Sequence, residues 1–432
     1  MSQKEIGVGL LGMGTVGRGV YRILNDNKDG IEKKTGAPIV VRKVLVRDTD
    51  KNRGVKTREG LLTTDINDIL NDPDIDIVVE LLGGINPALE YSLRALDKGK
   101  SVVTANKDMI ALHGKELFAA ADAGKRDLFF EGSVAGGIPI IRPLKECLAA
   151  NRITQVIGII NGTTNYMLTR MSDECLGFEQ ALKEAQSLGY AEADPSADVE
   201  GYDAARKLAI LASIAFNTRV SLDQVHVEGV TRITAEDIVY AANLNYVIKL
   251  LGIARDSAEG IEVRVHPTLL PKNHPLASVN DVFNAIFVTG DAVGDVMFYG
   301  RGAGELPTAS AVTADVMNAA RNLVNGSTGM IGCTCFESKP VKSMGLTSTE
   351  YYVRLDVADK PGVLASIAYI FGDNDVSLAS VIQHTTGKSA ELVLITHEVL
   401  EKNLQEALTG IKQLPVVNEV SNVIRVEGRK EG

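Results

Sequence analysis

Short apolar runs typical of buried strands alternate with helical patterns through the first third of the chain. The strand-like runs are "EIGVGLLG", "APIVVRKVLVRD", "DIDIVVELLGG", "KSVVTANK" and "DLFFEGSVAGG". Segments with helical spacing of apolar residues separate them, as in "TVGRGVYRILND" and "PALEYSLRALDKG". Strands that alternate with helices pair in parallel through right-handed crossovers. The pattern therefore predicts an α/β fold that begins with a doubly wound parallel sheet over residues 1–135.

A glycine-rich sequence, "GLLGMGTVGRG", lies between the first strand pattern and the first helix pattern. It has the G-x-G-x-x-G spacing at Gly12, Gly14 and Gly17, and Thr15 and Val16 lie between the last two glycines. The first glycine permits a tight turn, the second lets the main chain approach a pyrophosphate, and the third lets the helix pack close to the strand. The helix N-terminus adds N–H groups and a positive dipole end. This context predicts a Rossmann-type dinucleotide-binding domain.

The end of the second strand pattern bears on which dinucleotide binds. An acid at this place usually holds the ribose 2′-hydroxyl of NAD, whereas a cation suits the 2′-phosphate of NADP. The strand ends "VLVRD", which offers Arg47 as well as Asp48. We predict NADP from Arg47, and NAD stays open because Arg47 could equally be a solvated edge residue.

The stretch "VVTANKD" places Thr104 and Lys107 beyond the carboxyl end of a strand. Ligands bind at this edge of an open α/β sheet. Lys107 is therefore either a surface lysine or a residue of the cofactor crevice. "FEGSVAGGIPI" is either a tight turn or a loop whose carbonyls face a hard cation, and the polar loop in "IINGTTNYML" could simply cap a helix.

The rest of the chain predicts two more domains. Over residues 136–299 we expect an α+β domain with strands such as "RITQVIGIING" and long helices such as "FEQALKEAQSLG" and "AEDIVYAANLNYVIKLLG". The glycine-led helix over about 300–325 is expected to return to the first domain. Residues 326–349 read as a linker. Residues 350–432 follow the order βαββαβ, which packs helices on one face of an antiparallel sheet.

The helix "GYDAARKLAIL" carries a lysine inside an apolar stripe. Lys207 lies on the same face as Ala204, Leu208 and Leu211, with Asp203 one turn before it. A lysine at such a place usually extends to solvent. A buried ammonium needs carboxylate partners, and "YAEADPSADVE" supplies several. Such a lysine can have a tuned pKa and serve as a proton donor or acceptor.

Composition excludes several classes of protein. A net charge of −10 and a sequence pI near 5.3 argue against a nucleic-acid partner. The sequence shows neither an apolar run near the roughly 18 residues of a membrane span nor a signal-peptide start, so we expect a cytoplasmic protein without a membrane partner. Cys333 and Cys335 form a C-x-C pair in "GCTCF", and without further zinc-spaced ligands we read them as reduced thiols.

Five motifs in order carry a family resemblance: "GMGTVGRG", "TANKDMIALHG", "EGSVAGGIP", "NGTTNYML" and "GYAEADPSADVEGYDAARKLAIL". With them the chain resembles homoserine dehydrogenases over essentially its whole length, and the final module with "DKPGVL" resembles an ACT domain. The resemblance implies reversible NAD(P)H-dependent reduction of L-aspartate 4-semialdehyde to L-homoserine, on the path to threonine and methionine. It also implies a homodimer or homotetramer and threonine as the natural candidate effector.

The resemblance also implies residue roles. Lys207 corresponds to the catalytic proton donor and acceptor, and Lys107 to the lysine beside the reacting oxygen and the nicotinamide. The acids around the substrate's amino end and the catalytic lysine correspond to Glu192, Asp198 and Asp203. A sodium site corresponds to main-chain groups of Glu131, Val134, Gly136 and Ile138. The loop that returns to the cofactor corresponds to Gly302 and Gly304, and an amino-acid effector site to the loop Asp359 to Leu364, with Asp359, Gly362, Val363 and Leu364.

Two rival functions make different demands on the sequence. Aspartate-semialdehyde dehydrogenase needs a nucleophilic cysteine in a suitable loop. Cys147 and Cys175 have helix-like surroundings, which disfavours that enzyme. A catalytically silent, NADP-sensing protein that binds amino acids through its tail would need neither Lys207 nor Lys107.

Overall fold

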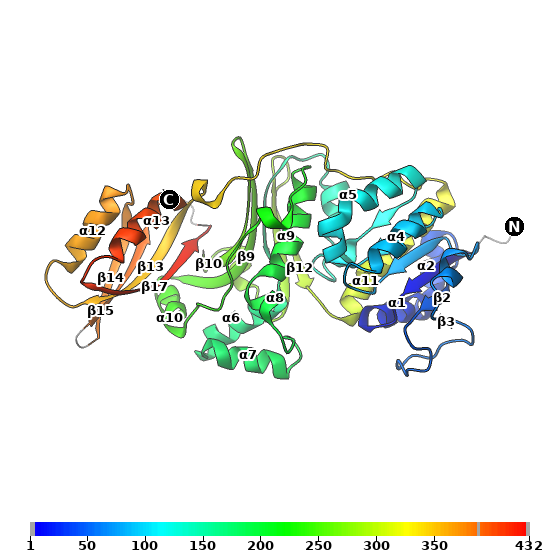
Figure 1. The fold of residues 1–432 in the computed structure, drawn as a ribbon, viewed down its shortest axis with the longest axis horizontal. Helices are drawn as coiled ribbons and strands as arrows, with labels where there is room; N and C mark the ends of the chain where they lie inside the picture. The colour runs from blue at the N-terminus through cyan, green and yellow to red at the C-terminus, as the bar shows by residue number, and fades with distance from the viewer. Residues whose placement is uncertain (1–4, 387–388, 429–432) are drawn as a thin grey trace. The chain divides into compact units, whose positions relative to one another are not determined.

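A computed structural model describes residues 5–386 and 389–428 of the chain (Figure 1). The chain divides into two compact units, each assembled from three stretches of sequence. The first unit holds the residues up to Ile153 together with Arg206–Leu222 and Val288–Ser338, and the second holds Thr154–Ala205, Asp223–Phe287 and the residues from Lys339 onward.

A parallel sheet forms the centre of the first unit, with the strand order β3-β2-β1-β4-β5-β6. Its strands are β1 (Ile6–Leu11), β2 (Ile39–Leu45), β3 (Leu62–Thr63), β4 (Ile77–Glu80), β5 (Ser101–Thr104) and β6 (Leu128–Phe129). This order is that of dinucleotide-binding folds. The predicted doubly wound Rossmann-type sheet is therefore confirmed. Its core includes the fully buried side chains of Val8, Leu10 and Ile77.

Helices flank this sheet in the first unit. They are α1 (Thr15–Asp26), α2 (Lys28–Thr35), α3 (Asn67–Leu70), α4 (Ala88–Asp97), α5 (Lys107–Gly124) and, from much later in the chain, α11 (Glu305–Asn325). α11 packs tightly on α1, as the labels in Figure 1 allow the reader to follow. A Cβ atom at Gly19 would lie 2.7 Å from the Cβ atom of Ala309, so a glycine permits this close approach.

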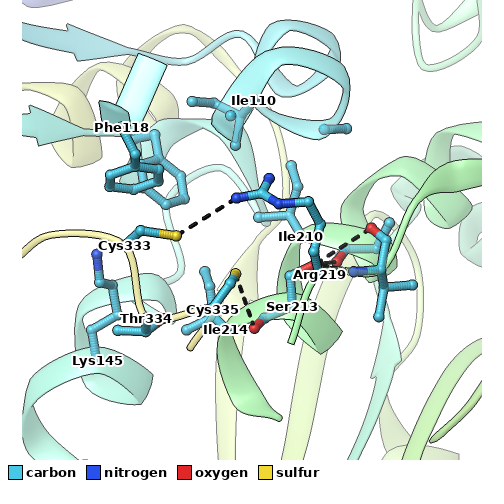
Figure 2. Close-up of a pocket in the computed structure, with 15 residues that line it drawn as sticks. Ile110, Phe118, Lys145, Ile210, Ser213, Ile214, Arg219, Cys333, Thr334 and Cys335 are labelled. Carbon is cyan, nitrogen blue, oxygen red and sulfur yellow. Dashed lines mark hydrogen bonds between the residues drawn. The ribbon is translucent and has the colours of Figure 1, made fainter. Parts of the chain in front are cut away.

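After α11 the chain stays in the first unit as far as Ser338. The ammonium of Lys145 donates to the main-chain oxygen of Gly332 over 2.9 Å. The main-chain nitrogen of Glu337 donates to the oxygen of Asn217 over 2.8 Å. Figure 2 shows the part of this segment that lies beside α9 (Tyr202–Ala215). The stretch that reads as a linker is thus tethered along this part of its length.

The second unit contains a mainly antiparallel sheet in which neighbouring strands follow the order β11-β7-β9-β10-β17-β13-β15-β14. Its first strands are β7 (Ile153–Ile159), β8 (His226–Val227), β9 (Tyr246–Ser257), β10 (Gly260–Pro271) and β11 (Phe283–Gly290), and β12 (Gly294–Arg301) leads back to the first unit. The helices of this part are α6 (Gly162–Glu174), α7 (Phe178–Ser187), α8 (Ser196–Val199) and α10 (Ala235–Asn243), and α9 begins in this unit and belongs to the first unit from Arg206 onward.

The prediction of one helix over residues 235–252 is wrong for the second half of this range, which forms a strand. α10 ends at Asn243, and β9 begins at Tyr246 after Asn245, whose φ of +66° interrupts the helix. The middle of β9 is almost continuously buried, and an apolar run of this kind does not distinguish a buried strand from a helix. Antiparallel pairing with β10 along the whole strand decides the structure.

The C-terminal module has the predicted βαββαβ order. Its elements are β13 (Ser348–Ala358), α12 (Val363–Asp373), β14 (Leu378–Thr386), β15 (Ser389–Thr396), the two-residue β16 (Val399–Leu400), α13 (Glu401–Ile411) and β17 (Val417–Val426). β17 pairs in parallel with β10, with Thr268 opposite Arg425. The module therefore continues the sheet of the second unit. Among the described residues, no helix is both long and apolar enough to cross a membrane.

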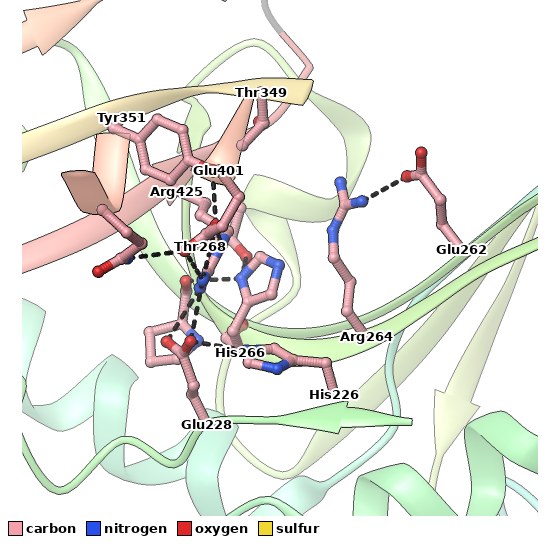
Figure 3. Close-up of polar contacts among 12 residues, drawn as sticks. His226, Glu228, Glu262, Arg264, His266, Thr268, Thr349, Tyr351, Glu401 and Arg425 are labelled. Atoms are coloured by element: carbon pink, nitrogen blue, oxygen red, sulfur yellow. Dashed lines mark hydrogen bonds and ion pairs between the residues drawn. The ribbon is translucent and has the colours of Figure 1, made fainter. Parts of the chain in front are cut away.

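A buried arginine holds this junction together (Figure 3). The guanidinium of Arg425 on β17 donates to both carboxylate oxygens of Glu228 over 2.9 Å and to those of Glu401 over 3.0 Å. Tyr351 donates to Glu401 over 2.6 Å. Burial opposes ionisation of Glu228, but hydrogen bonds from His226 and Arg425 hold the pKa of its carboxyl well below the usual range. The cation and its carboxylates form one network across the β10–β17 seam.

We expect Arg425→Met to lower the free energy of unfolding by about 3–5 kcal/mol, because it leaves the buried Glu401 carboxylate without its cation. Urea unfolding followed by circular dichroism measures the change. Lys402→Met on the same unit is the matched control, since it removes an exposed pair with Glu406 worth about 1 kcal/mol or less. Equal effects of the two substitutions would show that the seam does not depend on this arginine.

Candidate active site

The glycine loop between β1 and α1 has the conformation that its spacing predicts. Gly12 has a φ of +104°, and a Cβ atom there would lie 2.9 Å from the oxygen of Leu81. A Cβ atom at Gly17 would lie 2.4 Å from the oxygen of Gly12, so the helix packs on the turn only because residue 17 is glycine. Gly14 faces open space at the N-terminus of α1. Thr15 is exposed beside it, which leaves the first turn accessible to a phosphate.

A hydrogen-bonded chain joins the carboxyl ends of β4 and β5 to the start of α5. The hydroxyl of Thr104 donates to Glu80 over 2.7 Å and accepts from the main-chain nitrogen of Asn106 over 2.9 Å. The Asn106 side chain then caps α5 by accepting from Met109. Burial raises the pKa of Glu80, against the effect of these hydrogen bonds. Lys107, the first residue of α5, is held at this edge of the sheet.

The remaining predicted cofactor residues lie on loops. Arg47 is exposed, two residues beyond the end of β2. Thr104 is fully buried, and its hydroxyl donates to Glu80. Gly302 and Gly304 precede α11, and Gly304 has a φ of +124° that favours glycine.

The loop after β6 is organised by a buried carboxylate. Glu131 accepts hydrogen bonds from the main-chain nitrogens of Ile140, Ile141 and Arg142 over 2.6, 2.7 and 2.8 Å. Within this loop Ala135 and Gly136 have φ values of +56° and +55°. The residues of the expected sodium site, Glu131, Val134, Gly136 and Ile138, are all buried here. A buried loop with main-chain oxygens fits a hard cation in donor type.

Two of the expected substrate carboxylates are brought together by an asparagine. The side-chain nitrogen of Asn161 donates to Asp198 over 2.7 Å and to Asp203 over 3.0 Å, while its oxygen caps α6 at Thr164. Asp203 is buried, with 8% of its surface exposed. Glu192 is exposed and lies outside this hydrogen-bonded group.

α9 carries Asp203 and, one turn later, Lys207. The apolar stripe predicted for this helix is buried, and Lys207 is half-buried within it. The neighbouring Arg206 forms an ion pair with Asp108 over 3.1 Å. Because Asp108 follows Lys107 in the first turn of α5, this pair links the two helices at the positions of the two lysines.

The predicted effector loop opens α12 of the C-terminal module. Gly362 precedes the helix with a φ of +89°. Val363 is buried in the core of the module, Leu364 is partly exposed, and Asp359 is exposed. Asp359 and Leu364 therefore present side chains to solvent, whereas Val363 can offer a ligand only its main chain.

Comparisons with known proteins identify the family of the chain. Family models match residues 12–131 as the homoserine dehydrogenase NAD-binding domain, 139–317 as homoserine dehydrogenase and 351–416 as an ACT domain. A homoserine dehydrogenase of Bacillus subtilis is 45% identical and aligns over 98% of this chain and 99% of its own length. The chain belongs to the homoserine dehydrogenase family.

Solved structures of homoserine dehydrogenases agree with this assignment. That from Thiobacillus denitrificans is 45% identical, with a TM-score of 0.94 and 99% of each chain covered. A hyperthermophilic archaeal homoserine dehydrogenase in complex with NADPH is 28% identical, with a TM-score of 0.62, and covers 73% of this chain and 97% of its own. The protein is an oxidoreductase with a nicotinamide cofactor, and a catalytically silent regulator is not favoured.

Two residues that hold these hydrogen-bond networks of the homoserine dehydrogenase together, Glu80 and Asn161, were not predicted from the sequence. Glu80 ends a strand at the ligand-binding edge, and a carboxylate after a wholly apolar run was a usable signal. Asn161 ends the strand pattern in "IINGTTNYML", where cap residues are common, but its contacts to Asp198 and Asp203 lie 37 and 42 residues away. Only the folded chain brings them together.

Asn161→Ala and Asn106→Ala form a matched pair of tests. Each removes a helix cap, so we expect each to cost about 1 kcal/mol of stability. Asn161→Ala should raise the KM for L-homoserine by roughly tenfold and leave the cofactor KM unchanged, because it releases two carboxylates. Asn106→Ala should act mainly on the cofactor KM. Steady-state kinetics measures both KM values. If both variants shifted the two KM values equally, Asn161 would not act on substrate binding separately from Asn106.

Proposed function

We propose that Lys207 donates and accepts the proton in the interconversion of L-aspartate 4-semialdehyde and L-homoserine. The observation that carries this is an ammonium within the buried stripe of α9, one turn after a buried carboxylate. A bound nicotinamide supplies or accepts the hydride. During reduction, negative charge develops on the aldehyde oxygen, where the Lys207 ammonium stabilises it and then protonates it. During oxidation, the amine of Lys207 takes the hydroxyl proton.

The other polar groups bind and orient. Lys107, at the start of α5, supplies a second cation beside the reacting oxygen and the nicotinamide. Asp198, Asp203 and Glu192 receive the substrate's ammonium, and Asn161 fixes the first two of them through its side-chain nitrogen. Asp203 also restrains the Lys207 ammonium on the same helix.

Lys207→Ala should lower kcat by about 10²–10⁴-fold, because proton transfer in the transition state is lost. The kcat of Lys207→Arg should be as low as that of Lys207→Ala, because a guanidinium keeps the charge but does not release its proton. Initial rates with L-homoserine and oxidised cofactor measure both. Lys183→Ala, an exposed lysine on α7, is the control and should keep normal turnover. Near-normal turnover of Lys207→Ala would remove the assigned role.

The cofactor, the cation and the effector complete the proposal. NADP would bind with its pyrophosphate at Gly12, Gly14, Thr15, Val16 and Gly17, its 2′-phosphate near Arg47 and its nicotinamide near Lys107, and the loop with Gly302 and Gly304 would return to the cofactor. Sodium binds the loop of Glu131, Val134, Gly136 and Ile138, and threonine binds the ACT module at Asp359–Leu364. The active enzyme is a homodimer or homotetramer.

The same assay tests cofactor and effector. With NADP⁺ and NAD⁺ in separate reactions, we expect a lower KM for NADP⁺, and Arg47→Ser should reduce this preference by roughly tenfold because a charge-assisted contact is lost. Added threonine should lower the rate or shift the melting temperature. An unchanged ratio of the KM values for NADP⁺ and NAD⁺ in Arg47→Ser would exclude a contact between Arg47 and the 2′-phosphate. If threonine changed neither the rate nor the melting temperature, the ACT module would have a role in assembly only.

A further inference from the structure

A small cavity in the first unit is lined by two thiols, two cations and aromatic rings (Figure 2). The residues that matter here are Cys333, Cys335, Lys145, Arg219, Phe118 and Phe130. Its volume of about 40 Å³ has room for a molecule the size of water or hydrogen peroxide. Its lining includes no residue of the glycine loop and none of the carboxylates that Asn161 contacts.

Cys333 lies between the two cations. A guanidinium N–H of Arg219 donates to its sulfur over 3.6 Å. The ammonium of Lys145 lines the same cavity and is held by the oxygen of Gly332, over the ring of Phe118 at 5.0 Å. Cations beside a cysteine stabilise its thiolate, which is the nucleophilic form. Of the two thiols on the cavity, Cys333 is the one whose sulfur accepts from a guanidinium.

Cys335 has a different environment. Its sulfur donates to the main-chain oxygen of Ser213 on α9 over 3.7 Å. Burial, followed by the neighbouring Cys333, raises the pKa of its thiol to about 11. Cys335 is therefore a protonated thiol at neutral pH, two residues from Cys333 in the chain and on the same cavity. Two thiols this close in the chain are the components of a two-step oxidation.

We propose that Cys333 and Cys335 form a redox-active dithiol whose oxidant is a small hydroperoxide. The Cys333 thiolate attacks the peroxide, so that a sulfur–oxygen bond forms, the oxygen–oxygen bond breaks and hydroxide leaves. Cys335 then attacks the Cys333 sulfenic acid, which forms the disulfide and releases a second hydroxide. The protons of the two thiols convert both hydroxides to water. In total, two thiols are oxidised to one disulfide and one hydrogen peroxide is reduced to two waters.

The oxidised form differs from the reduced form at the helix that carries Lys207. A disulfide removes the S–H group that Cys335 donates to Ser213, six residues after Lys207 on α9. A disulfide across one intervening residue closes a very short loop, and strained disulfides of this kind are easily reduced. The oxidation is therefore reversible by a dithiol reductant. The proposal goes beyond the dehydrogenase reaction and does not rest on the proposed roles of its lysines.

The first test uses the intact wild-type protein and hydrogen peroxide. After full reduction, one equivalent of hydrogen peroxide is added, free thiols are alkylated, and peptides are analysed by mass spectrometry at several times. We expect the peptide with Cys333 and Cys335 to lose two hydrogens and escape alkylation, and dithiothreitol to reverse this. Cys147 and Cys175 are exposed and serve as internal controls. They should remain alkylated although they are more accessible.

Variants test the order of attack. Cys335→Ser should stop at a sulfenic acid on Cys333, which dimedone traps, whereas Cys333→Ser should leave residue 335 unoxidised. Arg219→Gln should slow disulfide formation by roughly tenfold, because it removes a cation from the attacking sulfur. Oxidation of Cys147 or Cys175 ahead of the pair would overturn the proposal, as would a disulfide between two chains. Unchanged kinetics in Arg219→Gln would show that the cation does not activate Cys333.

Discussion

The buried residue Glu131 joins its own loop to a helix far along the sequence. Its carboxylate accepts from the main-chain nitrogens of Ile140, Ile141 and Arg142, and its main-chain nitrogen donates to Asp315 on α11 over 2.8 Å. α11 in turn packs on α1 behind the glycine loop. Burial and the nearby Glu131 charge raise the pKa of Asp315 to about 8, so this contact tolerates two neighbouring acids. The geometry of the dinucleotide site depends on this arrangement.

The cost of burying charge explains several other features of the fold. A charge removed from water needs partners, and here they come from distant segments. The guanidinium of Arg425 donates to Glu228, which precedes β10 in the chain, and to Glu401 on α13. The ammonium of Lys249 on β9 donates to Asn165 on α6 and to the oxygen of Val279, and burial lowers its pKa to about 8. These contacts join elements that local sequence preference would leave independent.

The ACT module is part of the second unit through its main chain as well as its side chains. β17 extends the sheet at β10, and Arg354 on β13 donates to Asp237 at the start of α10 over 2.8 Å. An effector that binds at α12 would therefore act on a sheet that is continuous with β9 and β10. This continuity gives the module a physical connection to β7 and to the helices that follow it.

Local patterns determined the parallel sheet, the glycine turn, the βαββαβ order and the lysine in the stripe of α9, because spacing and glycine chemistry act within a few residues. Long-range contacts decided the rest. Pairing with β10 made Tyr246–Ser257 a strand, although its apolar run also suits a helix. The contacts of Asn161 with Asp198 and Asp203, and of Cys333 with Arg219, form only in the folded chain. Sequence spacing does not predict such contacts, because they depend on how whole elements pack.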